Sequence, residues 1–348
     1  MIGALVGVII LILIILAVPN LSYFLSILSS LNGTTGGQYT STFHVQGGNG
    51  SISQNPSIFN STLSISYPSD YATLRNFSLN LINRDRTAHD LSPVGVSQIQ
   101  SGQQHADSML KYGYFSHWDV QGLKPYMRYS ILGGTGFVEE NVAFEFTTFP
   151  TYSTVSSVER AITNLEYQMV NNDSYCCQNG HRDNILNQFH NAVSIGIAYN
   201  TTDVFFVEDF VTDYAGINSP IVSGGDTVNL VGTPSQSLDP SSIQVFYDGF
   251  PHSITTQDIR SNFSGPYDQG TFIGGVLPPC QSLFSCSSYQ GAITVQASTW
   301  SVGSSSLNIR FSLGDFINKY GSGVYTLYLI QGSTSNPEYL TSISVFVS

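Results

Sequence analysis

The chain has 348 residues and a net charge of −12 at neutral pH, yet only 10% of its residues are charged, against about a quarter in an average globular protein. Its 11 Lys and Arg residues are scattered along the sequence, which argues against a basic surface and a nucleic-acid partner. The length is sufficient for two domains, each with its own core.

The N-terminal segment is apolar. Residues 2–18 carry no charge and are almost wholly aliphatic, and residues 21–28 continue the apolar run beyond Pro19. This pattern predicts a transmembrane anchor or a signal segment over residues 1–31. No positively charged stretch precedes the run and no clear Ala-x-Ala cleavage site follows it. We therefore expect a retained anchor with the bulk of the chain at the cell surface, the alternative being cleavage and secretion.

Residues 32–69 predict a flexible stalk, because Gly, Ser, Thr, Asn and Gln dominate them and no Asp, Glu, Lys or Arg occurs before Asp70. Sequons of the form Asn-x-Ser/Thr are frequent along the chain, as in an extracellular glycoprotein. They begin at Asn20, Asn32, Asn49, Asn60, Asn76, Asn172, Asn200 and Asn262.

Residues 70–214 predict an α+β domain. Apolar residues at helical spacing indicate three helices, over residues 78–91, 96–112 and 156–170. Apolar residues that alternate indicate three strands, over residues 140–146, 192–199 and 204–211, the last two forming a hairpin. We expect a small antiparallel sheet with helices on its faces.

Residues 215–348 are poor in charge and consist of short β-like stretches separated by Gly, Ser, Pro and Asn. This texture predicts an all-β sandwich of immunoglobulin-like type, although a Cys…Trp…Cys framework is missing.

The four cysteines form two groups. Cys280 and Cys286, in the loop-like stretch PPCQSLFSC, predict a local disulfide outside the cell, with a metal site as the alternative. Cys176 and Cys177 are adjacent. Normal disulfide geometry disfavours a bond between neighbours, so free thiols and a link to another segment stay open beside a vicinal disulfide.

Four motifs follow one another in a recognisable order. They are YFSHWDVQGLKPYMR (114–128), EENVAFE (139–145), GHRDNIL (180–186) and the hairpin AVSIGIAY with FFVEDF. In this order they resemble the CAP superfamily of cysteine-rich secretory, antigen 5 and pathogenesis-related proteins, in its prokaryotic SCP-like branch, over residues 74–213. The resemblance implies a CAP-type α-β-α sandwich. The expected fold class is therefore α+β, with this sandwich before the immunoglobulin-like one and after an N-terminal transmembrane helix.

The resemblance also implies a cleft with two histidines and two acidic residues. Matched motif by motif, the first histidine is His117, the first acid is Glu140 and the second histidine is His181. The glycine usual before the first acid is replaced by Glu139, which adds charge at the rim. An insertion, SYCCQN, obscures the fourth position, for which the candidates in order of preference are Asp173, Glu166 and Asn172.

Two neutral imidazoles and a carboxylate can hold a divalent cation such as zinc with a position open for water. His117, His181 and Glu140 are therefore candidate metal ligands, and with Asp173 they are the candidate catalytic groups. The same groups can instead exchange a proton. We expect Arg128 and Arg182 to hold carboxylates of the fold rather than substrate.

We expect a surface binding module rather than an enzyme, because the family includes lipid binders and secreted interaction proteins and shares no single reaction. Its cleft would take a lipid, a small apolar ligand, a divalent ion or a surface protein. One alternative is a protease-like hydrolase in which a metal polarises water and Glu140 acts as base, although the motif His-Glu-x-x-His is lacking. The other is an adhesive surface protein that works through the β-sandwich.

Overall fold

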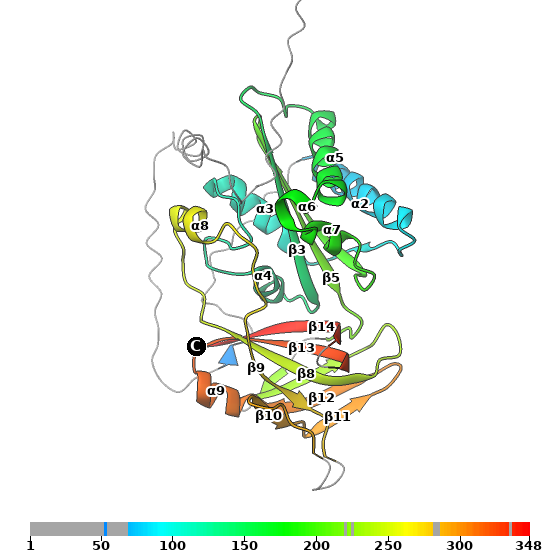
Figure 1. Ribbon diagram of the computed structural model, residues 1–348, viewed down its shortest axis with the longest axis vertical. Helices are drawn as coiled ribbons and strands as arrows, with labels where there is room; N and C mark the ends of the chain where they lie inside the picture. The colour runs from blue at the N-terminus through cyan, green and yellow to red at the C-terminus, as the bar shows by residue number, and fades with distance from the viewer. Residues whose placement is uncertain (1–51, 54–68, 219–220, 224–225, 281–285, 334–335) are drawn as a thin grey trace, which may run out of the picture.

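The computed structural model of the chain describes residues 52–53, 69–218, 221–223, 226–280, 286–333 and 336–348. The apolar segment at residues 1–31, with its predicted transmembrane helix, and nearly all of the stalk lie outside these residues. The described residues form two units, which lie one above the other in Figure 1.

The first unit, residues 69–214, is built on a four-stranded sheet with the strand order β2-β4-β5-β3. Its strands are β2 (Gly95–Val96), β3 (Phe137–Phe146), β4 (Ala192–Tyr199) and β5 (Asp203–Thr212). Strands β4 and β5 form the predicted hairpin, and β3 pairs with β5 so that Glu140 lies opposite Asp209. The short β2 runs parallel to β4. This register places two acidic residues side by side on the edge strand β3 and its neighbour β5.

Helices cover both faces of this sheet (Figure 1). On one face lie α2 (Tyr71–Ala88), α5 (Val155–Asn171), α6 (Ser174–Cys177) and α7 (Gly180–Ile185), and on the other lies α3 (Ser101–Tyr112). The apolar stripe of α5 is buried against β-strand residues, as its spacing predicts. Helix α3 can approach β4 closely because residue 102 is a glycine. A Cβ at this position would stand 2.5 Å from the Ser194 carbonyl oxygen.

The second unit consists of two sheets around an apolar core. One sheet has the order β1-β14-β13-β8-β9-β10 and the other β11-β12-β7-β6. The strands of the first are β1 (Ile52–Ser53), β8 (Pro240–Asp248), β9 (Thr271–Leu277), β10 (Ile293–Gln296), β13 (Gly323–Ser333) and β14 (Asn336–Val347). Those of the second are β6 (Ile221–Ser223), β7 (Thr227–Gly232), β11 (Thr299–Val302) and β12 (Leu307–Ser312). A disulfide joins Cys280 to Cys286, which confirms the predicted local bond.

One segment of the second unit leaves its sheet and packs on the first unit. This segment, residues 249–270, connects β8 to β9 and contains α8 (Thr256–Asn262), which lies beside α3 in Figure 1. Ile259 is fully buried in a cluster with Met109 and Tyr114 of the first unit. The Ile254 N–H donates to the Val120 carbonyl oxygen at 3.0 Å. We call residues 249–270 the bridging segment.

The two units are also joined through α4 (Pro125–Ile131), whose apolar residues share a cluster with residues of β13 and β14. The Lys124 ammonium donates to Asp248 at 2.8 Å and to Asp268 at 2.5 Å. The Tyr126 hydroxyl donates to Asp248 at 2.7 Å. Apolar packing of Ile259, a backbone hydrogen bond and the ion pair from Lys124 to Asp268 therefore hold the bridging segment against the first unit.

The predicted fold class is wrong as stated. The first sheet is mixed rather than antiparallel, because β2 is parallel to β4. The second unit is not all β, because it contains α8 and α9 (Gly314–Tyr320), and its larger sheet is mixed through the parallel pair β9 and β10. Among the described residues no helix has the length and apolarity needed to cross a bilayer. The helices α8 and α9 have about two turns each, which is too short for their apolar periodicity to be recognised in the sequence. The direction of a strand depends on how the chain connects it to its neighbour, which the pattern of apolar residues within the strand does not encode.

Candidate functional site

A cavity of about 550 Å³ lies in the first unit and is bordered by the bridging segment. Its floor is β3, and its sides are the stretch after α3 and the turn between α6 and α7. The bridging segment supplies Ser264 to Tyr267 and Gln269. The apolar lining residues are Phe115, Val142, Ala143, Phe144, Met169, Pro266 and Tyr267. His117, Glu140 and His181, which the motifs singled out, all border this cavity.

His117 is held by Glu140. Its Nδ1 lies 2.9 Å from Oε1 of Glu140, which projects from β3. The other carboxylate oxygen accepts from the guanidinium of Arg128 on α4, and Arg128 also donates to the His117 carbonyl oxygen at 2.8 Å. Arg128 is only 1% exposed and Glu140 only 3%. The expectation that Arg128 holds a carboxylate is confirmed.

Burial sets the protonation of this pair. It lowers the pKa of His117 to about 3, and the nearby charges of His181 and Arg128 act in the same direction. Burial raises the pKa of Glu140 to about 7, although Arg128 opposes the shift. His117 is therefore a neutral imidazole at every ordinary pH, and Glu140 titrates near neutrality.

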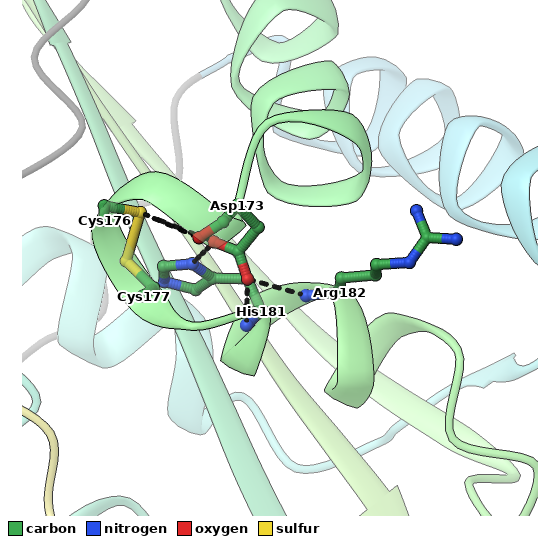
Figure 2. Close-up of a disulfide and its surroundings, with 5 residues drawn as sticks. All are labelled: Asp173, Cys176, Cys177, His181 and Arg182. Atoms are coloured by element: carbon green, nitrogen blue, oxygen red, sulfur yellow. Dashed lines mark hydrogen bonds and ion pairs between the residues drawn. A yellow bond between two sulfur atoms is a disulfide. The ribbon is translucent and has the colours of Figure 1, made fainter.

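His181 is held by Asp173 (Figure 2). The Asp173 Oδ1 lies 2.6 Å from the imidazole Nδ1, and Oδ2 accepts from the His181 backbone N–H at 2.8 Å. The Arg182 backbone N–H also donates to Oδ2, at 3.2 Å. Asp173 is 2% exposed. A turn through Gln178 and Asn179, with φ of 52° and 70°, brings α7 back against this carboxylate.

The other candidates for the fourth cleft position lie elsewhere. The Glu166 carboxyl is buried beside Glu208, and burial raises the pKa of both, that of Glu208 to about 7. The Asn172 side chain donates to Gln168 at 2.8 Å. Arg182 does not hold a carboxylate as expected: its guanidinium donates to the Val170 carbonyl oxygen, which anchors α7 to α5.

Asn141 connects the strand of Glu140 to the helix of His181. Its amide nitrogen donates to the His181 carbonyl oxygen at 3.1 Å and to Glu208 at 3.2 Å. Its amide oxygen accepts from Asn184 at 2.9 Å. These three contacts fix α7 against β3, so the His117 and His181 side chains border the same cavity.

Tyr267 of the bridging segment is a cavity residue that the motifs did not indicate. Its hydroxyl accepts from the Glu140 backbone N–H at 3.0 Å, and its ring centroid lies 5.0 Å from that of His117. Tyr267 belongs to a loop of the second unit, so no periodicity or motif links it to the cleft. Only the path of the bridging segment brings it there.

The predicted metal ligands do not form a ready cation site with Glu140, because its two oxygens are engaged by His117 and Arg128. Among the described residues, Asp173, Cys176, Cys177 and His181 gather as potential ligands, with ligand atoms that all lie within 4.8 Å of one another. Cys176 and Cys177 form a disulfide with each other, which resolves the alternatives left open for them. Figure 2 shows this disulfide against the His181 ring.

The sequence matches no family model, and no curated protein is detectably similar. One similar solved structure is an extracellular protein containing a SCP domain from Bacillus anthracis str. Ames, with 20% sequence identity and a TM-score of 0.29. The likeness covers 42% of this chain and 45% of that one. A TM-score this low carries no argument about fold or function.

Proposed function

We propose that this chain is an extracellular, CAP-like binding module whose cavity takes a small amphipathic ligand. The observation that carries the proposal is the pairing of both cavity histidines with carboxylates through Nδ1, His117 with Glu140 and His181 with Asp173. The CAP resemblance of the motifs supports it.

The pairing makes the two imidazoles a polar end of the cavity. Because each Nδ1 is engaged, Nε2 is the ring atom left to meet a ligand. The pKa of His117, about 3, keeps that ring uncharged. It therefore serves as a hydrogen-bonding group without the desolvation cost of a buried charge.

The rest of the cavity wall is apolar and can contact the hydrocarbon part of a ligand. Phe115 and Phe144 lie against each other with ring centroids 6.0 Å apart, and both line the cavity with Met169. The volume of about 550 Å³ lies inside the range of about 300 to 1,000 Å³ usual for small-molecule sites. A single-chain fatty acid is the ligand class that we propose for this shape and polarity.

Two disulfides support the extracellular location, because such bonds persist in oxidising compartments. The sequons and the scarcity of charge are in keeping with it.

Titration of the chain with cis-parinaric acid, a fluorescent fatty acid, tests the proposal. We expect saturable binding of one molecule per chain, weakened at least about tenfold by Phe115→Ala through loss of apolar contact. Phe149→Ala is the matched control, because Phe149 is 76% exposed and does not line the cavity. Equal affinity in the two variants, or no saturable binding, would remove the proposal.

The same two pairs favour a divalent cation as a second candidate ligand. A carboxylate on Nδ1 is the usual support of a metal-binding histidine, so the residues present fit a cation held by Nε2 of His117 and of His181. A bound zinc would polarise water there, which is the chemistry of the hydrolase alternative.

Calorimetric titration with zinc separates this candidate from the first. We expect binding that is lost in both His117→Ala and His181→Ala and kept in His252→Ala, a histidine on the surface of the bridging segment. Binding that survives in either cavity variant would exclude the two-histidine cation site.

A further inference from the structure

The adjacent cysteines lie beside the cavity in a setting that the ligand-binding proposal does not use. Cys176 and Cys177 are the last two residues of α6 (Ser174–Cys177), and both line the cavity next to His181. The Sγ atom of Cys176 lies 3.5 Å from Oδ1 of Asp173, the same oxygen that lies 2.6 Å from the His181 ring. Two sulfurs, an imidazole and a carboxylate therefore converge on one point (Figure 2).

The geometry points to a thiolate metal site that forms when the Cys176–Cys177 disulfide is reduced. Its ligands are the two thiolates, the His181 Nδ1 and the Asp173 Oδ1, and its metal is a thiophilic divalent cation of the zinc class. In the disulfide the sulfurs are bonded to each other and are poor ligands. After reduction they supply two of the four donors of a tetrahedral Cys₂HisAsp site.

The reductant of the Cys176–Cys177 disulfide is a dithiol. The dithiol attacks the disulfide through a mixed disulfide, becomes a disulfide itself, and leaves Cys176 and Cys177 as thiols that hold its two electrons and two protons. The cation then displaces the two thiol protons to solvent and takes the place of the proton between Nδ1 and Oδ1, which passes through solvent to the His181 Nε2, so the imidazole stays neutral.

The four ligands are already ordered by the fold. All lie between positions 173 and 181, so the loop that metal binding closes is short and costs little entropy. The Asp173 carboxylate keeps its orientation through Oδ2, which accepts from the backbone N–H groups of His181 and Arg182 at 2.8 and 3.2 Å. Its Oδ1 therefore stays directed at the sulfurs and the ring.

The site differs from the two-histidine cation site proposed above, since it needs the cysteines and not His117. His181 and Asp173 would belong to both, so only variants outside this shared pair separate them. His117→Ala abolishes the first site and leaves the thiolate site intact. The failure of one proposal is thus distinguishable from the failure of the other.

The experiment uses the full chain and cobalt(II) as the metal alone. The chain is reduced with dithiothreitol without oxygen, desalted and titrated, and the sulfur-to-cobalt charge-transfer band is recorded. We expect one cobalt per reduced chain, no such band before reduction, and displacement of cobalt by zinc. Cys176→Ser/Cys177→Ser should lose the band, whereas the matched control Cys280→Ser/Cys286→Ser, at the other disulfide, should keep it.

A second measurement does not depend on a variant that folds. In the reduced wild-type chain, zinc should protect Cys176 and Cys177 from iodoacetamide by at least about tenfold and leave Cys280 and Cys286 reactive, as read by peptide mass spectrometry. A thiolate band in the Cys176→Ser/Cys177→Ser variant, or reduced chain that shows neither band nor protection, would overturn the proposal.

Discussion

The hydroxyl of Tyr267 accepts a hydrogen bond of 3.0 Å from the backbone N–H of Glu140, although 127 positions separate the two residues. Glu140 lies on β3 of the first unit, and Tyr267 belongs to the bridging segment of the second. The cavity is therefore completed by both units, and a change in the second unit reaches the residues that hold His117.

Tyr267→Phe tests this contact. The variant leaves the buried Glu140 N–H without an acceptor, so we expect the free energy of unfolding to fall by about 1 to 3 kcal/mol. Urea denaturation measures it. Tyr175→Phe is the control, because Tyr175 is 88% exposed. Equal stability of Tyr267→Phe and the wild type would mean that water replaces the phenol and that the contact is not needed.

The Arg128–Glu140 pair gives a double-mutant cycle. Arg128→Met leaves the Glu140 carboxylate buried without its cation, for which we expect a loss of about 3 to 5 kcal/mol of unfolding free energy. The double variant Arg128→Met/Glu140→Gln buries no unpaired charge and should be more stable than Arg128→Met. The measurement is urea denaturation at pH 8, above the wild-type Glu140 pKa of about 7. Because Arg128 lowers that pKa, Glu140 in Arg128→Met must either stay charged without a cation or take up a proton, and both cost stability. Strict additivity of the two substitutions would contradict coupling.

His117 gives a pH dependence with a defined sign. Its pKa falls from 6.5 to about 3 on folding, so its contribution to stability is full above pH 6.5 and is lost as the pH falls towards 3. We expect the unfolding free energy of the wild type to decrease more steeply between pH 6.5 and 4 than that of His117→Gln. His252→Gln, at the surface, should follow the wild type. Parallel curves for wild type and His117→Gln would show that His117 protonates freely in the folded chain.

Gly102→Ala tests the close approach of α3 to β4. An added Cβ would stand 2.5 Å from the Ser194 carbonyl oxygen, so helix and strand must separate, and we expect a loss of about 1 to 3 kcal/mol. Gly249→Ala is the control, since nothing lies within 4 Å of its added Cβ. Thermal unfolding compares the two variants, and a Gly102→Ala chain as stable as the control would refute the tight contact.

The local elements of the first unit could be read from short patterns. The apolar spacing of residues 156–170 corresponds to α5 (Val155–Asn171), and the alternation of residues 192–199 corresponds to β4. The helix expected over residues 78–91 is α2 (Tyr71–Ala88), which begins earlier because Tyr71 and Leu74 are also buried. Each pattern predicted its element correctly because the residues on the buried face of a helix or strand recur with the period of that element.

The candidate site shows the limit of such patterns. His117, Glu140 and His181 were found because they lie inside motifs, and the structure brings them to one cavity. The preference for Asp173 beside His181 rested only on an interrupted motif. The motif order placed Asp173 first among three candidates, but the contact itself is made by the tight turn through Gln178 and Asn179, which the inserted residues do not predict.

By itself, the sequence determined the helices and strands with clear periodicity, the bond between Cys280 and Cys286, and the two histidines of the cleft, because each depends on residues close together in the chain. Only the tertiary structure decided the direction of the strands, the pairing of Cys176 with Cys177, the engagement of Glu140 by Arg128, and the entry of Tyr267 into the cavity wall. Strand direction, the Arg128 contact and the position of Tyr267 depend on the path of the backbone between distant segments, which no local pattern records. The pairing of Cys176 with Cys177 is local, but it depends on whether another sulfur comes within reach, which the sequence does not record either.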